Sequence, residues 1–300
     1  MAEPEFRAGF GCLVGRPNAG KSTLTNALVG EKVAITSDKP QTTRRAIRGI
    51  VNRPGAQLVL VDTPGLHRPR TLLGERLNDL VAETWSDVDV IGLCVPANEP
   101  IGPGDRFIVR ALQGVRATKL AIVTKTDLAD RQTVAQQLLA VSALADFAEV
   151  VPVSAVSGEQ VELVAELMIG QLPPSPMLYP DDVATDEPTR VRIAEFVREA
   201  ALEGVRDELP HSIAVLVEEM TEETTRGGEP LTRIYADLYI ERPSQKAIVI
   251  GRGGERLRRV GAAARTQIEQ LLGTKVFLDL HIRVAKEWQR DPKQLRKLGF

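Results

Sequence analysis

The sequence predicts two domains: an α/β domain with a mostly parallel sheet, then a smaller α+β domain with the element order αββααβ. Short apolar runs alternate with amphipathic stretches from Phe6 to about Leu172, and this alternation is typical of a sheet covered by helices on both faces. A proline-rich segment, Pro173–Asp182, then interrupts regular structure. We therefore expect a first domain at residues 1–173, a linker at 174–184 and a second domain at 185–300 with a basic C-terminal tail.

The strands of the first domain are expected in short, β-branched runs that are almost continuously apolar. Runs of this kind suit strands that are buried on both faces. They read FGCLVG, AQLVLVD, VDVIGLCV, KLAIVTK and AEVVPVS. An antiparallel edge strand is expected at Arg45–Asn52. The helices are expected at Lys21–Val29, Leu72–Trp85, Gly104–Leu112, Ala129–Leu144 and Gly158–Leu172.

The second domain is expected to combine three helices with three strands. The expected elements, in order, are helix Glu187–Val205, strands Ser212–Met220 and Leu231–Glu241, helices Ser244–Val249 and Glu255–Leu272, and strand Lys275–Val284. Residues 231–300 carry 15 Lys and Arg against 7 Asp and Glu, whereas residues 1–230 carry 23 against 33. A basic module on an acidic body is a candidate for binding phosphate backbones.

Composition excludes several other classes of protein. No apolar run approaches the ~20 residues that a membrane-spanning helix needs, and the N-terminus has no apolar signal core. Cys12 and Cys94 lie in apolar runs, so we expect buried thiols rather than a disulfide or a metal pair. The three histidines are too far apart in sequence to have metal-ligand spacing.

The stretch GRPNAGKST follows the first strand and opens a helix, as the pattern G-x-x-x-x-G-K-[ST] of a phosphate-binding loop requires. Its glycines permit a tight loop whose backbone N–H groups converge on phosphate oxygens. Lys21 adds a positive charge, and the Ser22 hydroxyl suits Mg²⁺. The residues expected at the phosphates are Gly15, Arg16, Pro17, Asn18, Ala19, Gly20, Lys21, Ser22, Thr23 and Gly65.

The stretch LVLVDTPGL is expected to complete the phosphate and metal site. Asp62 ends a buried strand, where a carboxylate is costly unless it meets a cation. Either Thr42 or Thr43, in the loop KPQTTRR, could close on Mg²⁺ when a triphosphate is bound; the sequence does not choose between them. Leu66 stands where some GTPases have a water-orienting glutamine, so the missing group must come from elsewhere or turnover must be slow.

The stretch TKTD, at the end of the KLAIVTK strand, is expected to read a guanine base. The Asp127 carboxylate can accept hydrogen bonds from guanine N1–H and the 2-amino group, whereas adenine offers neither donor. The stem of Lys125 can lie over the base. Thr124 stands where such an element usually begins with asparagine, so we predict retained guanine selectivity and binding weaker by ~1 kcal/mol for one compromised hydrogen bond.

A second glycine loop, Gly251-Arg252-Gly253-Gly254, joins two expected helices. No Lys-Ser/Thr follows it, and its glycines do not fit G-x-G-x-x-G. The loop and the αββααβ order are similar to those of type II KH domains, whose GxxG loop approaches about four nucleotides of single strand. The residues expected at RNA are Ile250, Gly251, Arg252, Gly253, Gly254, Arg256, Arg258 and Arg259.

The motifs GRPNAGKST, QTTR, DTPGLH and VPVSA, followed by a KH-like domain, resemble those of the bacterial Era GTPases over nearly the whole chain. The resemblance implies a cytoplasmic GTPase that uses GTP/GDP and Mg²⁺, binds the 3′ region of 16S rRNA and assists 30S subunit assembly. It implies a K⁺ ion at Asn18 that stimulates a slow reaction, and a base pocket lined by Ser154 and Ala155. No DNA partner is expected.

Several alternatives stay open from the sequence. The chain could be an RNA-binding module whose nucleotide site senses GTP with almost no hydrolysis, or an ATPase with a similar loop. The second domain could instead take a protein or membrane partner. The basic tail, residues 283–297, could add phosphate contacts, dock on the KH sheet or touch the inner face of the cell membrane. Within it, Trp288 is expected to be a packing anchor rather than a platform for a base.

Overall fold

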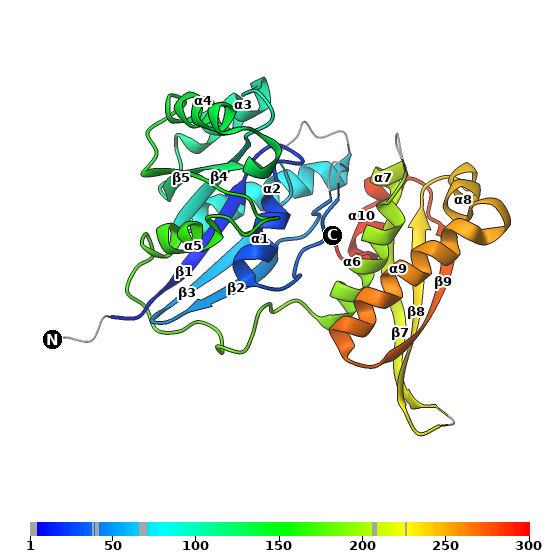
Figure 1. Cartoon of the computed structure of the whole chain (residues 1–300). Helices are drawn as coiled ribbons and strands as arrows, with labels where there is room; N and C mark the ends of the chain where they lie inside the picture. The colour runs from blue at the N-terminus through cyan, green and yellow to red at the C-terminus, as the bar shows by residue number, and fades with distance from the viewer. Residues whose placement is uncertain (1–4, 38, 40–41, 66–70, 206–208, 226) are drawn as a thin grey trace. The chain divides into compact units, whose positions relative to one another are not determined.

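The computed structural model describes residues 5–37, 39, 42–65, 71–205, 209–225 and 227–300 (Figure 1). The chain divides into two compact units. The first is built mainly from the residues up to Asp186, and the second mainly from Glu187 to Phe300. Each unit has its own sheet, as the sequence predicts.

The first unit contains a six-stranded sheet with the order β2-β3-β1-β4-β5-β6. Its strands are β1 (Arg7–Val14), β2 (Ile47–Arg53), β3 (Ala56–Asp62), β4 (Val90–Pro96), β5 (Thr118–Thr124) and β6 (Glu149–Pro152). Only β2 is antiparallel to its neighbour; β3, β1, β4, β5 and β6 are mutually parallel. The predicted parallel sheet with an antiparallel edge strand is confirmed.

Helices cover both faces of this sheet (Figure 1). One core joins the strands to α1 (Lys21–Val29) and α5 (Val161–Ile169), through side chains such as Leu24 and Met168. The other core joins them to α2 (Leu72–Asp87), α3 (Pro103–Leu112) and α4 (Arg131–Ser142), through side chains such as Trp85 and Ile108. Because both faces are covered, β3 and β4 are buried along their whole length.

In the first unit, two helices are shorter than the sequence predicts, and local backbone chemistry explains where each of them begins. The Asp130 side chain accepts a hydrogen bond from the Thr133 N–H at 2.7 Å, so it caps α4 and the helix begins at Arg131. Before α5, Gly158 and Gln160 both have positive φ angles, +81° and +61°. A helix cannot pass through such residues, and α5 begins at Val161.

The proline-rich segment packs against the edge of this sheet. The buried Gln57 side chain accepts hydrogen bonds from the backbone N–H groups of Leu178 and Tyr179, both at 2.9 Å, and donates to the Tyr179 carbonyl at 2.9 Å. Further along, the Ile50 N–H donates to the Ala184 carbonyl at 2.8 Å. The expected linker is therefore held on the β2–β3 hairpin before the chain enters the second unit.

The second unit contains a three-stranded sheet with helices packed on it. Its strands are β7 (Ala214–Thr224), β8 (Pro230–Ile240) and β9 (Lys275–Val284), with β7 antiparallel and β9 parallel to the central β8. Its helices are α6 (Thr189–Leu202), α7 (Leu209–Ser212), α8 (Pro243–Ile250), α9 (Glu255–Leu272) and α10 (Pro292–Lys297). With the short α7 and α10 set aside, the order is the predicted αββααβ.

The C-terminal tail docks on the second unit. Trp288 is fully buried, donates its indole N–H to the Ser212 carbonyl at 3.0 Å and stacks on Phe300 with ring centroids 5.8 Å apart. The Lys297 ammonium contacts the Tyr239 hydroxyl at 2.9 Å. Trp288 is a packing anchor, as predicted. Of the roles that the sequence left open for the tail, these contacts show one, which is docking on its own unit.

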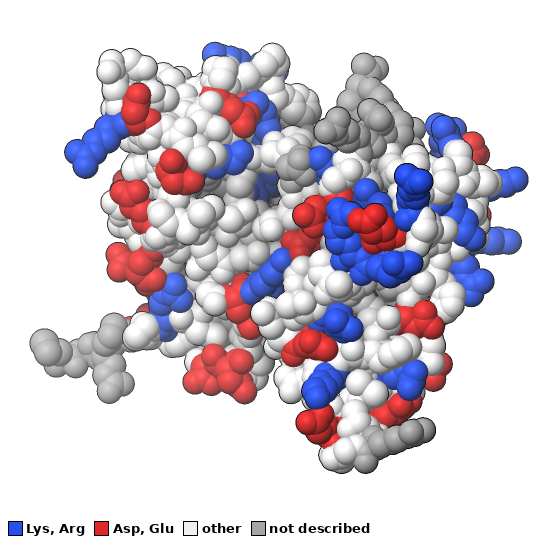
Figure 2. Space-filling view, turned by 45° about the vertical axis from the view of Figure 1, so that its right-hand side comes forward, with Lys and Arg blue, Asp and Glu red and all other residues white. Residues whose placement is uncertain are grey.

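Among the residues that the structure describes, no helix is both long and apolar enough to cross a bilayer. Charged side chains of both signs are interleaved over the surface, including that of the second unit (Figure 2).

We predict that Gln57→Ala frees the linker from the first unit. The change removes hydrogen bonds at a fully buried side chain and leaves the N–H groups of Leu178 and Tyr179 unpaired. The free energy of unfolding of the first unit should fall by about 2–4 kcal/mol, and chymotrypsin should cleave after Leu178 faster than in the unmutated chain. Arg48→Ala, which removes an exposed ion pair to Asp186, is the control and should change the free energy by less than about 1 kcal/mol. Equal protection of Leu178 in all three proteins would contradict the prediction.

Candidate nucleotide-binding site and KH loop

The loop between β1 and α1 has the backbone geometry of a phosphate-binding loop. Gly20 has a φ angle of +89° and precedes the first residue of the helix, and Asn18 has a φ angle of +62°. The Lys21 side chain curls back over the loop, where its ammonium donates to the carbonyls of Gly15 at 3.2 Å and Arg16 at 2.9 Å. The N-terminus of α1 and a lysine therefore face the same concave loop, as an anion site requires.

Two buried, opposite charges lie at the centre of the site. Lys21 and Asp62 are 8% and 1% exposed. Burial lowers the pKa of Lys21 and raises the pKa of Asp62, because both charged forms lose their hydration. Each charge partly offsets the shift of the other.

Two hydroxyl groups converge on Asp62. Ser22 Oγ donates to Asp62 Oδ2 at 2.9 Å, Thr43 Oγ1 donates to the same oxygen at 3.1 Å, and the two hydroxyl oxygens are 3.1 Å apart. The Thr42 hydroxyl instead donates to the Lys39 carbonyl at 2.6 Å. Of the two threonines left open by the sequence, the structure brings Thr43 to the cluster.

The cluster fits Mg²⁺. Among the described residues, Asp62 Oδ1 is buried and has no hydrogen-bond partner, so it is an acceptor that a cation could satisfy. The carboxylate and the two hydroxyls are the hard oxygen ligands that Mg²⁺ prefers, and Mg²⁺ takes its remaining ligands from water and phosphate. Ser22, Thr43 and Asp62 are therefore the residues that would hold the ion.

Gly65 lies close to the loop. A Cβ added at Gly65 would be 3.7 Å from Lys21 Nζ and 3.6 Å from the Pro17 backbone nitrogen. A phosphate held by Lys21 would thus be near the Gly65 backbone, as expected from the DTPG stretch. Leu66, the position expected to lack a water-orienting group, lies outside the described residues.

The expected base-reading residues also come together, at the ends of β5 and β6. Ser154 is fully buried and donates to Asp127 Oδ1 at 2.7 Å, whereas Asp127 itself is exposed. Lys125 has a φ angle of +57°, and its ammonium is 3.7 Å from Glu99. Ser154 therefore orients the carboxylate toward solvent, where a base could pair with it, and the half-buried Ala155 follows.

One contact of the phosphate loop is not predicted by the sequence. Arg16 Nε donates to the fully buried carboxylate of Asp105 at 2.8 Å, and Arg16 Nη2 is 3.4 Å from Glu99. Asp105 also accepts from the Gly102 N–H at 2.8 Å and so caps α3. The stretch GPGD could have predicted the helix start, but no local pattern pairs it with a loop 89 residues earlier.

In the second unit, three glycines shape the turn between α8 and α9. Gly251, Gly253 and Gly254 have φ angles of +73°, +59° and +79°. A Cβ added at Gly251 would be 2.6 Å from the Arg256 Cβ, whereas one added at Gly253 would meet nothing within 4 Å. Gly253 therefore marks the open side of the turn, where a ligand backbone could approach.

The arginines around this turn have different contacts. Arg256 donates to the carbonyls of Ala201 at 3.2 Å and Glu203 at 2.7 Å, so it holds the end of α6. Arg258 donates to the Gly253 carbonyl at 2.6 Å, and Arg259 forms an exposed ion pair with Glu255 at 3.2 Å. Arg252 is exposed at the tip, and Ile250 is half-buried at the end of α8. Of the four arginines expected at RNA, Arg252 therefore has the most direct access, and Arg256 has a structural task.

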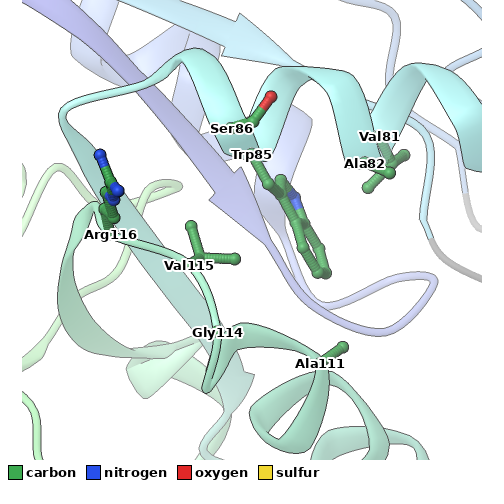
Figure 3. A pocket seen from close by; sticks show the side chains of 8 residues that line it. All are labelled: Val81, Ala82, Trp85, Ser86, Ala111, Gly114, Val115 and Arg116. Atoms are coloured by element: carbon green, nitrogen blue, oxygen red, sulfur yellow. The ribbon is translucent and has the colours of Figure 1, made fainter.

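The first unit has a second hollow that does not suit a nucleotide. It has a volume of about 620 Å³ and lies between α2 and the turn after α3, where the Trp85 ring faces Val115 (Figure 3). Its walls are apolar apart from Ser86 and Arg116. It lacks the convergent backbone N–H groups that phosphates need.

The two cysteines lie beneath the site rather than in it. Cys12 and Cys94 are both buried on the central strands, as predicted. Burial raises the pKa of the Cys94 thiol to about 12 and raises that of Cys12 as well. Both thiols stay protonated at neutral pH and act as small apolar side chains.

Comparisons with known proteins match both units. Residues 11–125 match the family described as 50S ribosome-binding GTPase, and residues 208–289 match the KH domain. The chain is 65% identical to GTPase Era of Streptomyces coelicolor, covering 100% of this chain and 96% of that protein. It is 64% identical to GTPase Era of Mycolicibacterium smegmatis, covering 99% of each.

Two solved structures are similar over almost the whole chain. One is Era in complex with MgGDPNP and nucleotides 1506–1542 of 16S ribosomal RNA, with a TM-score of 0.92 and 32% identity over 98% of this chain and 99% of that one. The other is an Aquifex aeolicus Era variant bound to GDP·AlF4⁻, with the same TM-score, identity and coverage.

We predict that Thr43→Ala and Thr42→Ala separate the two threonines. Thr43→Ala removes a hydroxyl from the Asp62 cluster, so the Mg²⁺ concentration that half-saturates binding of a non-hydrolysable GTP analogue should rise about fivefold to tenfold. Thr42→Ala removes only a loop hydrogen bond and should leave that concentration within about twofold. A Mg²⁺ titration of analogue binding measures both. The reverse order of effects would contradict the assignment.

Proposed function

This chain belongs to the Era family of GTPases, and from that premise we propose that it is a nucleotide-switched RNA-binding protein that assists assembly of the 30S ribosomal subunit. The observation that carries the proposal is the presence, in one chain, of the Ser22–Thr43–Asp62 cluster and the GxxG loop of a KH domain. The solved relative bound to MgGDPNP and to nucleotides 1506–1542 of 16S rRNA supports the 3′ region of that RNA as the partner.

The reaction is hydrolysis of GTP by water to GDP and phosphate. The backbone of the Gly15–Thr23 loop and the Lys21 ammonium bind and orient the phosphates. Ser22, Thr43 and Asp62 would hold Mg²⁺, which would neutralise phosphate charge when bound. Asp127, oriented by Ser154, and the Lys125 stem hold the base. An adenine ring has no N1–H and no 2-amino group to donate to this carboxylate, so GTP is selected over ATP.

The nucleotide state is proposed to control RNA affinity. Thr43 and Gly65 lie beside the loop that would hold the phosphates, so the segments that carry them should change when the γ-phosphate is lost. The KH loop, 251–254, would hold single-stranded RNA with Arg252 at the tip. The proposed division is a nucleotide domain at 1–173, a linker at 174–184 and an RNA-binding domain at 185–300.

The proposed location is the cytoplasm. Lys286, Arg290 and Lys293 of the tail are exposed, which supports peripheral contact with an anionic membrane face as a finer part of the proposal.

We predict that changes at the KH loop remove RNA binding and spare nucleotide binding. Gly253→Asp places a like charge where the RNA backbone would approach, and Arg252→Glu reverses the exposed charge at the tip. Each should weaken binding of an RNA from the 3′ region of 16S rRNA at least tenfold, with GDP affinity unchanged. Lys246→Glu, an exposed change on α8 outside the loop, is the charge-matched control and should have a smaller effect. Unchanged RNA affinity in both loop variants would refute the KH assignment.

We predict that hydrolysis is slow and is faster in K⁺ than in Na⁺. Asn18 lies in the phosphate loop with a φ angle of +62°, and a K⁺ ion bound there would add positive charge to a site in which Leu66 cannot orient the attacking water. Single-turnover GTP hydrolysis in the two salts, for the unmutated chain and for Asn18→Ala, measures this; the variant should lose the K⁺ preference. Equal rates in the two salts would rule the ion out, and no hydrolysis with or without RNA would favour the nucleotide-sensing alternative.

A further inference from the structure

The Thr124 hydroxyl ties the base-reading element to the phosphate loop. Thr124 ends β5 and is 3% exposed, and its Oγ1 donates to the Ala19 carbonyl at 2.7 Å. The two segments also pack closely, because a Cβ added at Gly20 would lie 3.6 Å from the Thr124 Cβ. A threonine hydroxyl carries one proton. That proton is committed to Ala19, so Thr124 has no second donor to offer a base.

The neighbouring side chains do not replace this donor. The Ser154 hydroxyl donates its proton to Asp127, and the Asp127 carboxylate can only accept when it is ionised. The Lys125 ammonium is directed to Glu99, 3.7 Å away. Thus the side chains proposed to surround the base provide acceptors for N1–H and the 2-amino group. Their own polar hydrogens are directed to protein groups and not to the base.

Guanine N7 is a hydrogen-bond acceptor on the imidazole side of the base, opposite the edge that Asp127 would read. An asparagine side chain carries two N–H donors, so an asparagine at position 124 could give one to the Ala19 carbonyl and the other to N7. A threonine can donate to only one of these partners, and in this structure its hydroxyl donates to the Ala19 carbonyl of the phosphate loop.

We infer that, because of Thr124, this guanine site makes no hydrogen bond to N7 and recognises the base only along its N1 and 2-amino edge. The inference rests on the proposed base-binding role of Lys125, Asp127 and Ser154. The site should therefore accept guanine nucleotides whose N7 is replaced by carbon as well as it accepts GDP. Thr124 is the specificity-determining residue, and its hydroxyl serves to hold the phosphate loop.

The test compares GDP with 7-deaza-GDP, in which a C–H group replaces N7. The dissociation constants of the two should agree within about twofold for the full chain, because no hydrogen bond is lost. Thr124→Ser keeps the hydroxyl and should keep the ratio near one. Thr124→Asn should bind GDP about fivefold more tightly than 7-deaza-GDP, the effect of one net hydrogen bond. The two dissociation constants are compared within each protein, so a loss of stability in a variant affects both and leaves their ratio unchanged.

Two results would overturn the inference. One is a preference of about fivefold or more for GDP over 7-deaza-GDP in the unmutated chain, since the hydroxyl would then turn from Ala19 to N7. The other is a ratio that stays near one in Thr124→Asn, since position 124 would then not control recognition of N7. Thr124→Val, which keeps the shape and removes the hydroxyl, should weaken both nucleotides equally.

A separate variant tests the base-binding role beneath the inference. Asp127→Asn should weaken GDP and erode its preference over ADP. If Asp127→Asn does neither, the proposed base site is wrong. If Asp127→Asn has a clear effect but the unmutated chain prefers GDP over 7-deaza-GDP, the base site stands and only the role of Thr124 is contradicted.

Discussion

The buried carboxylate of Asp62 is the constraint on which the nucleotide unit depends. A charged group at the end of a fully buried strand is stable only when charges and donors surround it. Two segments supply them to Asp62 at the end of β3: α1 with Lys21 and Ser22, and the segment before β2 with Thr43. These segments must meet at one edge of the sheet, which is why the parallel order of β3 and β1 with the antiparallel β2 beside them is needed.

The β2–β3 hairpin connects this cluster with the linker. At one end, Ile47 pairs with Asp62, a few residues after Thr43. At the other end, Asn52 pairs with Gln57, and both side chains hold the backbone of the proline-rich segment. Two strands of seven residues thus lie between the Ser22–Thr43–Asp62 cluster and the chain that leads to the KH unit. A buried polar network of this kind fixes the position of the linker on the nucleotide unit.

Much of the fold was predictable because its signals are local. The bounds of α1, α9 and β9 agree with the sequence prediction. Glycines with positive φ angles flank both helices, and the glycine after α9 also separates that helix from β9. The phosphate loop was predictable from spacing alone. The choice between Thr42 and Thr43, the pairing of Arg16 with Asp105 and the use of Arg256 to hold α6 were not predictable. Each depends on contacts between residues that the fold brings together, and composition carries no trace of them. The same is true of Thr124, whose departure from asparagine was visible in the sequence while its partner, Ala19, was not.

The proposed switch requires that the nucleotide bound near Asp62 changes the affinity of the KH unit for RNA. It is tested most directly by measuring the dissociation constant of an RNA from the 3′ region of 16S rRNA for the full chain with Mg²⁺ and a non-hydrolysable GTP analogue, and again with GDP. A coupling free energy of about 1–3 kcal/mol is typical of such switches, so we expect the two constants to differ at least about fivefold. Equal constants in the two states would contradict the switch.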